Sequence, residues 1–388
     1  MTARQAQVDR LRNLRAKIDQ RLHNWQKEVV DTTGIKPRKE FNCVDLFCGA
    51  GGNSLGLREA GFNGLLSVEI DPDASETHRM NFPEFRHFEG DIRKITDKEI
   101  KDAAGGKTVH VMAAGFPCQG FSIAGKSGDK IVNHSTVNNF WGKGNLSDEE
   151  LYAIDERNFL YREVVRFARI LKPWYLVMEN VPGIINMAKG RFVDSILKDF
   201  DNLGYSGMSL SILESAAYGV PQVRPRAIFI GNRFGLANPY PKPVLAVSKY
   251  VPIEAAIDDL RDKDRNHETS HEWTDHRPEM IKRISKVEPG HSLYEKWLDA
   301  NKRQYKGVPS MTIKENHGTT HIHYDLNRTL SAREMARLQS FPDSFKFSGR
   351  MKRVFWQVGN AAPPLLFKHL GLALTPRLVE IKKSQQQK

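Results

Sequence analysis

Cys118 lies within the stretch GFPCQGFS (residues 115–122), between a proline and a glutamine and just after the apolar run 109–114. A buried structural cysteine would lie inside such a run, whereas this one lies at its exit. A cysteine nucleophile needs partial exposure and a lowered pKa, and the end of a strand provides the exposure. Taken alone, however, a single cysteine is more simply interpreted as a buried structural thiol.

Glu179 follows a second apolar run, Tyr175–Met178, so we expect it at a neighbouring strand end that faces the same crevice as Cys118. A carboxylic acid shielded in such a crevice can stay protonated and donate a hydrogen bond to a ring nitrogen. The simpler interpretation of this one residue is a glutamate that caps the next segment.

The segment QVRPR places Gln222, Arg224 and Arg226 at alternate positions, so they share one face if the segment is an extended strand. Two guanidinium groups on one face suit a carbonyl oxygen or a phosphate, and nearby arginines would also favour a thiolate. A solvated basic strand is the simpler interpretation of this segment on its own.

A glycine-rich stretch, DLFCGAGG at residues 45–52, follows a predicted strand and begins a predicted helix. Glycines allow a ligand to approach the backbone closely, and a helix N-terminus offers free N–H groups. The stretch has neither the spacing of the dinucleotide fingerprint nor the lysine of a phosphate-binding loop. Glu69, at the end of the next strand, is placed to hold ribose hydroxyls, and Asp91 is placed to bind an adenine amino group.

Alternating strands and helices are expected to position these residues. The apolar runs predict strands, and a helix is predicted over 158–171; the strands are Asn42–Phe47, Leu65–Val68, Val109–Ala114 and Tyr175–Met178. This alternation predicts an α/β fold with a doubly wound, mostly parallel sheet and helices on both faces. Ligands of such sheets bind beyond the carboxyl ends of the strands, where every polar cluster named above falls.

Several segments do not follow that alternation. Residues 4–30 show apolar residues at helical spacing and predict an amphipathic helix that packs on its own domain, pairs with a partner or lies along DNA. Residues 34–39 are a predicted linker. Residues 128–156 are a predicted long loop. Residues 235–325 contain most of the histidines and are predicted to form a second domain.

The composition narrows the class of protein. The chain has 388 residues and a formal net charge of +12, which favours a phosphate-rich partner such as nucleic acid. No apolar run approaches the roughly 20 residues that span a membrane, and the N-terminus has no apolar signal region. Three cysteines cannot form a disulfide framework, which indicates a reducing, cytoplasmic environment.

Taken together, six segments in order resemble the successive signature motifs of the cytosine-C5 DNA methyltransferase family: DLFCGAGG, GFPCQGFS, MENVPG, QVRPR, RTLSAREMARLQSFPDSF and QVGNAAPP. The resemblance covers residues 41–234 and 326–368. It departs from the family at Ala362, where valine is usual. It implies a Rossmann-like methyltransferase fold with a smaller target-recognition domain, S-adenosylmethionine as cofactor, and a flipped-out cytosine of double-stranded DNA as substrate.

The resemblance assigns roles to the residues at the motif positions. Cys118 would attack cytosine C6, and Glu179 would engage N3 and the exocyclic amine. Arg226, supported by Arg224, would bind the base carbonyl, and Asn180 would orient the loop that carries Cys118. Gln222 completes the catalytic group. The implied cofactor pocket consists of Phe47, Gly49, Gly51, Glu69, Ile70, Asp91, Ile92, Pro117, Asn360 and Ala361.

The same resemblance divides the chain into four parts: an N-terminal helix and linker (1–40), a catalytic domain (41–234), a target-recognition domain (235–327) and a C-terminal segment returning to the catalytic domain (328–388). Residues 119–140 have the composition of a lid. Candidate DNA contacts are Arg261, Lys263, Arg265, Lys302, Arg303, Lys306 and Lys314. Six histidines of this region have no accompanying cysteine, so we predict no metal site and expect solvated side chains or contacts to DNA; they are His267, His271, His276, His317, His321 and His323.

Two other functions fit parts of the sequence. A tRNA cytosine-C5 methyltransferase would share the catalytic domain. Such enzymes have a smaller recognition region, however, so the long segment 235–327 argues against this function. A non-enzymatic DNA-binding protein is disfavoured by the intact Cys118, Glu179 and Arg226. For the preferred function we expect a monomer associated with the nucleoid. It would act either with a restriction endonuclease that shares its target without a stable complex, or as an orphan methylase.

Overall fold

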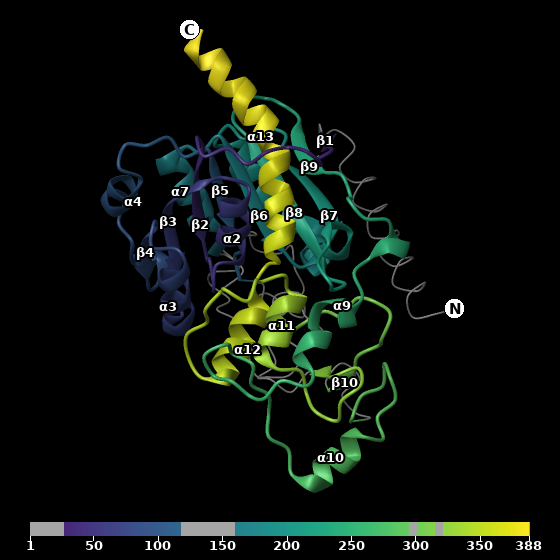
Figure 1. Cartoon of the computed structure of the whole chain (residues 1–388). Coiled ribbons are helices and arrows are strands. Elements are labelled where there is room, and N and C mark those ends of the chain that lie inside the picture. Colours follow the sequence, from purple (N-terminus) through teal and green to yellow (C-terminus); the bar gives the residue numbers. More distant parts are fainter. Residues whose placement is uncertain (1–26, 118–159, 295–300, 315–320, 388) are drawn as a thin grey trace.

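The computed structural model describes residues 27–117, 160–294, 301–314 and 321–387, and its core is one seven-stranded sheet (Figure 1). The strand order is β4-β3-β2-β5-β6-β8-β7. The strands are β2 (Asn42–Leu46), β3 (Asn63–Glu69), β4 (Arg86–Glu89), β5 (Val111–Ala114), β6 (Tyr175–Asn180), β7 (Ser209–Glu214) and β8 (Pro225–Asn232). The strands β2 to β6 pair in parallel, and β8 runs antiparallel to both β6 and β7. The predicted mostly parallel α/β sheet is confirmed.

Helices cover both faces of this sheet because its strands are apolar on both sides. Successive residues of β2 point to opposite faces: Cys43 belongs to one buried cluster and Val44 to the other. The helices that flank the sheet are α2 (Gly52–Glu59), α3 (Pro72–Asn81), α4 (Asp97–Ala104), α7 (Tyr161–Leu171), α8 (Arg191–Asp201) and α13 (Pro364–Gln386). The four strands and the helix predicted from apolar runs are all present, with shifts of a few residues at their ends.

The C-terminal helix α13 packs against α2, as Figure 1 shows for the two helices in front of the sheet. Glycines make this close approach possible: a Cβ at Gly52 would lie 2.1 Å from the Ala362 carbonyl oxygen, and one at Gly56 would lie 2.4 Å from that of Pro364. The glycine-rich stretch and the GNAAPP stretch are therefore in direct backbone contact, although they are 300 residues apart in sequence.

The N-terminal prediction is wrong for its last four residues. Lys27–Val30 form the strand β1, which pairs in parallel with β9 (Asn238–Pro241). The valines at its end suit an extended strand, and the partner strand lies 200 residues away, so a local helical pattern could not reveal the pairing. The rest of the predicted helix, the predicted lid and the 128–156 loop lie outside the described residues.

The remaining elements lie together at one end of the sheet (Figure 1). They are α9 (Ile253–Ile257), α10 (Pro278–Ile284), β10 (Lys302–Arg303), β11 (His321–Ile322), α11 (Ala332–Leu338) and α12 (Met351–Asn360). The short 3-10 helices are η1 (Ile92–Lys94), η4 (Pro182–Gly190), η5 (Ser215–Tyr218), η6 (Val247–Lys249) and η7 (Asp258–Leu260). Among the described residues, no helix combines the length and the apolar character needed to cross a bilayer.

Candidate active site

The chain leading to Cys118 is fixed up to Pro117, while Cys118 itself lies outside the described residues. Gly115, directly after β5, donates its N–H to the Leu46 carbonyl oxygen at 3.2 Å. Asn180, a buried residue at the end of β6, donates from Nδ2 to the Phe116 carbonyl oxygen at 3.2 Å. This bond anchors the exit of β5 two residues before Cys118, which supports the role predicted for Asn180.

Glu179 lies next to that exit because β5 and β6 are adjacent parallel strands. Its Oε2 atom is 3.8 Å from the position that a Cβ on Gly115 would occupy. On its other side, Glu179 Oε1 is 2.5 Å from Arg226 Nε, and the two side chains are 14% and 8% exposed. A carboxyl group and a guanidinium group are therefore paired in a largely buried position beside the strand exit.

Arg226 is a residue of β8, whereas Gln222 and Arg224 come before this strand begins at Pro225. Of the three residues only Arg226 lies within the regular strand, but the side chains of Gln222 and Arg224 still meet, since Arg224 Nη1 lies 3.5 Å from Gln222 Oε1. A single face shared by all three side chains stays a prediction. The Gln222 N–H donates to the Val220 carbonyl oxygen at 2.7 Å in a tight turn. This turn precedes the segment, and Gln222 itself forms an isolated parallel bridge with Ser310.

Arg224 is nearly fully buried and binds backbone carbonyl groups. Nη1 donates to the Ile313 carbonyl oxygen at 2.6 Å, and Nη2 donates to those of Gly359 and Ala361 at 2.8 and 3.0 Å. Burial lowers the pKa of this guanidinium well below its usual value. Arg224 therefore ties the strand that holds Arg226 to two distant segments of the chain.

Gln222 acts in the same way through its amide group. Oε1 accepts from the Ile313 N–H at 2.8 Å, and Nε2 donates to the Leu338 carbonyl oxygen and to Gln339 Oε1, each at 3.0 Å. Both residues are thus placed to support the backbone around the Glu179–Arg226 pair, and whether either contacts a substrate stays a prediction.

The glycine-rich loop after β2 has the backbone of a ligand cradle. Phe47 and Gly49 have φ values of 56° and 54°. A Cβ at Gly49 or at Gly90 would meet no atom within 4 Å, so both glycines border open space. A ligand can therefore approach the main chain at these two positions.

Glu69 holds that loop from the end of β3. Oε2 accepts from the Gly49 N–H at 2.8 Å, and Oε1 accepts from the N–H groups of Ile70 and Asp71 at 2.9 Å. Burial raises the pKa of the Glu69 carboxyl. The neighbouring Ile70 side chain is 65% exposed and offers an apolar surface on which a flat ring can stack.

The other predicted cofactor residues lie at the same ends of the strands, in different environments. Asp91 follows β4, and its Oδ2 pairs with Arg93 Nη2 at 2.6 Å, while the side chain of Ile92 is part of the buried core. Asn360 is exposed at the end of α12, and the Ala361 carbonyl oxygen accepts from Arg224 and from Gln339. The open backbone at Gly49, the apolar surface of Ile70, and the carboxylates of Glu69 and Asp91 together fit a cofactor that contains a nucleoside.

A buried polar network beneath this loop was not foreseen. Asp45, which is fully buried, accepts from Asn53 Nδ2 at 3.1 Å and from Ser54 Oγ at 2.7 Å. Burial raises the pKa of its carboxyl to about 7. The signal in the sequence was an aspartate inside the apolar run NCVDL, because a buried acid requires hydrogen-bond donors close by.

The candidate DNA contacts are mostly engaged within the protein. Arg303 is buried and donates to four backbone carbonyl oxygens and to Asn327 Oδ1, so this prediction is wrong for Arg303. Arg261 pairs with Asp325 at 2.6 Å, and Lys263 lies 3.4 Å from Asp259. Arg265 pairs with Asp275, and Lys306 lies over the ring of Tyr324.

Three histidines of this region are buried, so the expectation of solvated or DNA-facing side chains is wrong for them. His271 Nδ1 lies 2.9 Å from Ser331 Oγ, and His321 Nδ1 lies 2.8 Å from Gln304 Nε2. His323 Nδ1 accepts from the N–H groups of Asp325 and Leu326. They stabilise the turns of the segment from inside.

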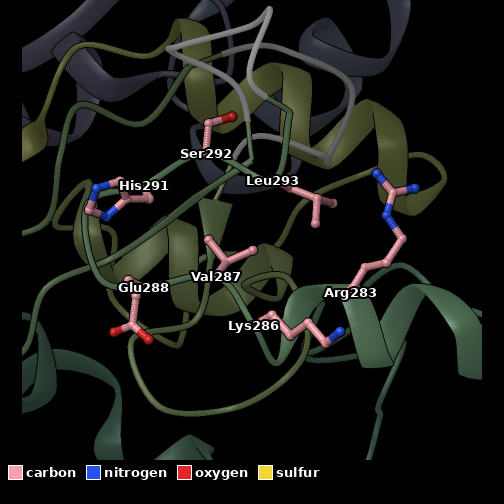
Figure 2. Close-up of a pocket in the computed structure, with 7 residues that line it drawn as sticks. All are labelled: Arg283, Lys286, Val287, Glu288, His291, Ser292 and Leu293. Atoms are coloured by element: carbon pink, nitrogen blue, oxygen red, sulfur yellow. The ribbon is translucent and has the colours of Figure 1, made fainter.

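A hollow of about 430 Å³ lies beside α10, at the far end of the molecule from α13 (Figure 1, Figure 2). It is lined by Arg283, Lys286, Val287, Glu288, His291, Ser292 and Leu293. Figure 2 shows Arg283 and Lys286 on one side of this hollow and Glu288 and His291 on the other. The two cations come from α10 and its end, outside the residues predicted to contact DNA.

Comparison with known proteins places this geometry in context. A family model described as C-5 cytosine-specific DNA methylase matches residues 41–375. The Type II methyltransferase M1.HphI of Haemophilus parahaemolyticus is 34% identical over 343 residues, covering 85% of this chain and 86% of that protein. The Type II methyltransferase M.Sau96I of Staphylococcus aureus is 32% identical, covering 89% and 78%.

Solved structures share the fold. A candidate DNA modification methyltransferase encoded in an E. coli prophage superposes with a TM-score of 0.66 at 24% identity, covering 88% of this chain and 100% of that one. The Dnmt2 protein of Spodoptera frugiperda superposes with a TM-score of 0.56 at 18% identity, covering 88% and 100%. At these identities the likeness concerns the fold alone.

Proposed function

The chain belongs to the C-5 cytosine-specific DNA methylase family, and on that premise we propose that it methylates C5 of a flipped-out cytosine in double-stranded DNA. It is thus a DNA (cytosine-5-)-methyltransferase, and we propose Cys118, Glu179 and Arg226 as its reacting groups. The observation that carries the assignment is the Glu179–Arg226 pair, 2.5 Å apart beside the strand exit that leads to Cys118.

The thiolate of Cys118 adds to C6 of the cytosine and forms a carbon–sulfur bond. The electron pair of the C5–C6 double bond moves toward C5 and N3, where the Glu179 carboxyl donates a proton or hydrogen bond. Arg226 binds the O2 carbonyl and keeps Glu179 in place. After C5 is methylated, the C5 proton passes to solvent, the proton on N3 returns to Glu179, and elimination of Cys118 restores the C5–C6 double bond and releases the thiolate.

S-adenosylmethionine supplies the electrophilic methyl group when it is bound. Glu69 would take the ribose hydroxyls, Phe47 and Ile70 would cover the adenine faces, and Asp91 would bind the adenine amino group. Gly49 borders open space and allows the backbone approach, whereas the missing side chain of Gly51 makes room for Phe82. Pro117, Asn360 and Ala361 would complete the walls, and Ile92, whose side chain lies in the core, would contribute only its main chain. The exposed Ile70 and the open space at Gly49 support this pocket.

DNA binding is proposed at the end of the molecule that carries α10. A cation without an acidic partner is available for a phosphate, whereas Arg261, Lys263 and Arg265 already face aspartates. No ion pair of Lys286 occurs within the described residues, and it lines the α10 hollow beside Arg283 (Figure 2). We therefore propose that Lys286 and Arg283 contact DNA phosphate groups on behalf of the segment 235–327.

The experiment is methyl transfer to duplex DNA, read by bisulfite sequencing of DNA from a host that expresses the chain. It is expected to reveal C5 methylation in one sequence context, and Cys118→Ser is expected to abolish it while leaving cofactor binding nearly intact. Duplex DNA with 5-fluorocytosine at the target should trap a covalent adduct, because fluorine cannot leave as a proton. Full activity of Cys118→Ser, or no adduct, would contradict the assignment.

The same assay separates the alternative substrate. Methyl transfer to tRNA but not to duplex DNA would favour a tRNA cytosine-C5 methyltransferase. For the DNA enzyme we propose a monomer that works in the cytoplasm on the nucleoid. A restriction endonuclease would share its target without forming a stable complex, in keeping with the Type II names of its relatives.

A further inference from the structure

Cys48, His78 and His87 form a cluster of potential metal ligands behind the glycine-rich loop. One donor atom from each side chain lies within 4.8 Å of the donor atoms of the other two. Cys48 belongs to the loop after β2, His78 to α3 and His87 to β4. Their spacing in the sequence matches no local metal-binding motif. They come together only because the fold places the three elements side by side.

We propose that Cys48, His78 and His87 bind one zinc-class divalent cation, with the Cys48 thiolate and two imidazole nitrogens as ligands. Tetrahedral zinc with bonds of about 2.0–2.3 Å separates its ligand atoms by about 3.3–3.8 Å. The longest separation between donor atoms therefore has to shorten by about 1 Å when the cation binds. Binding would release the Cys48 proton to solvent.

One imidazole nitrogen of the cluster is left without a partner. His87 Nε2 is shielded from solvent and has no hydrogen-bond partner among the described residues, whereas His87 Nδ1 lies 2.9 Å from Ser67 Oγ. A buried nitrogen with nothing to bind is uncommon and costs stability. A cation at this position would satisfy it.

The residues that hydrogen-bond to the proposed ligand His78 resemble those around the histidine ligands of known metal sites. His78 Nε2 lies 3.0 Å from Ser54 Oγ, and Ser54 in turn donates to Asp45 Oδ2 at 2.7 Å. Such a chain to a carboxylate fixes the orientation of a metal-ligating histidine.

The cluster lies directly under the cofactor loop. A Cβ on Gly51 would be 3.1 Å from His78 Cδ2, and Cys48 stands between Phe47 and Gly49. A cation bound there would join the loop to α3 and β4. The expected consequence is a higher melting temperature of the protein in the presence of the cation.

The test uses the full chain with the substitution Cys118→Ser as background, freed of metal by a chelator and titrated with Co²⁺. We expect one equivalent to bind, with a thiolate-to-cobalt charge-transfer band and the visible absorption of tetrahedral cobalt. Cys48→Ser should lose the charge-transfer band, and His87→Gln should bind Co²⁺ at least tenfold more weakly. The matched controls Cys43→Ser and His110→Gln, at a buried thiol and a buried imidazole elsewhere, should behave as the background does.

X-ray absorption of the zinc-loaded, unsubstituted chain provides a second measurement that does not depend on the folding of a variant. One sulfur and two imidazole nitrogens around the zinc would support the proposal. Absence of the cobalt bands, their persistence in Cys48→Ser, or a zinc shell without sulfur would overturn it.

Discussion

Arg226 Nε and Glu179 Oε1 are 2.5 Å apart, and both side chains are largely buried at the carboxyl end of the sheet. A buried charge that loses its partner is costly, so neither residue can be removed without consequence for the other. The pair therefore keeps a carboxyl group in place next to the strand that leads to Cys118.

Glu179→Gln tests the acid at this position. The amide keeps the size of the side chain but cannot give a proton to N3, so we expect the single-turnover rate of methyl transfer to fall by about 100-fold or more. Binding of S-adenosylhomocysteine, measured by calorimetry, should stay within about twofold, because the pocket is built by other strands. An unchanged rate would remove Glu179 from the mechanism.

Asn180→Ala tests the anchor of the Cys118 segment. Loss of the 3.2 Å bond to the Phe116 carbonyl group should loosen the strand exit and slow adduct formation with 5-fluorocytosine DNA by about tenfold. The KM for DNA should change little, because Asn180 is buried and does not line the α10 hollow. Equal losses in kcat and in DNA affinity would instead indicate general unfolding.

Arg224→Gln tests the buried arginine. Three carbonyl oxygens, at Ile313, Gly359 and Ala361, would lose a charged donor, and we expect a loss of about 3 kcal/mol in the free energy of unfolding. Urea unfolding followed by circular dichroism measures this loss. Arg261→Gln is the matched control, because its pair with Asp325 is exposed and screened by solvent, so the free energy of unfolding should change much less than in Arg224→Gln.

These residues also show how far the sequence alone can lead. Apolar runs predicted the strands because burial on both faces leaves a continuous signal. The glycines marked the loop after β2, where Gly49 borders open space, as a place at which a ligand can approach the main chain. The strand β1 was missed because its stability comes from β9, 200 residues away. The roles of Arg224 and Arg303 were missed because a single sequence does not distinguish a buried arginine from an exposed one.

Glu214→Gln tests a pH dependence of stability. Burial raises the pKa of the Glu214 carboxyl from 4.5 to about 7, and its Oε2 atom has no partner among the described residues. Between these two pKa values the folded chain binds more protons than the unfolded chain, so stability falls as the pH rises. When the pH is raised from 5 to 8, the free energy of unfolding should fall by about 2 kcal/mol less in the variant than in the parent chain, as measured by urea unfolding. Parallel curves would mean that Glu214 titrates normally.

Lys286→Ala tests the proposed DNA contact beside α10. Each neutralised phosphate releases condensed counterions, so removal of one contact should lower the slope of log K against log salt by about 1 and weaken binding to all sequences alike. Lys263→Ala is the matched control from the same part of the chain, because Lys263 lies 3.4 Å from Asp259 and should leave the slope unchanged. Fluorescence anisotropy with duplex DNA at several salt concentrations measures both slopes. If the slope changed for Lys263→Ala but not for Lys286→Ala, the DNA would lie along η7 instead of α10.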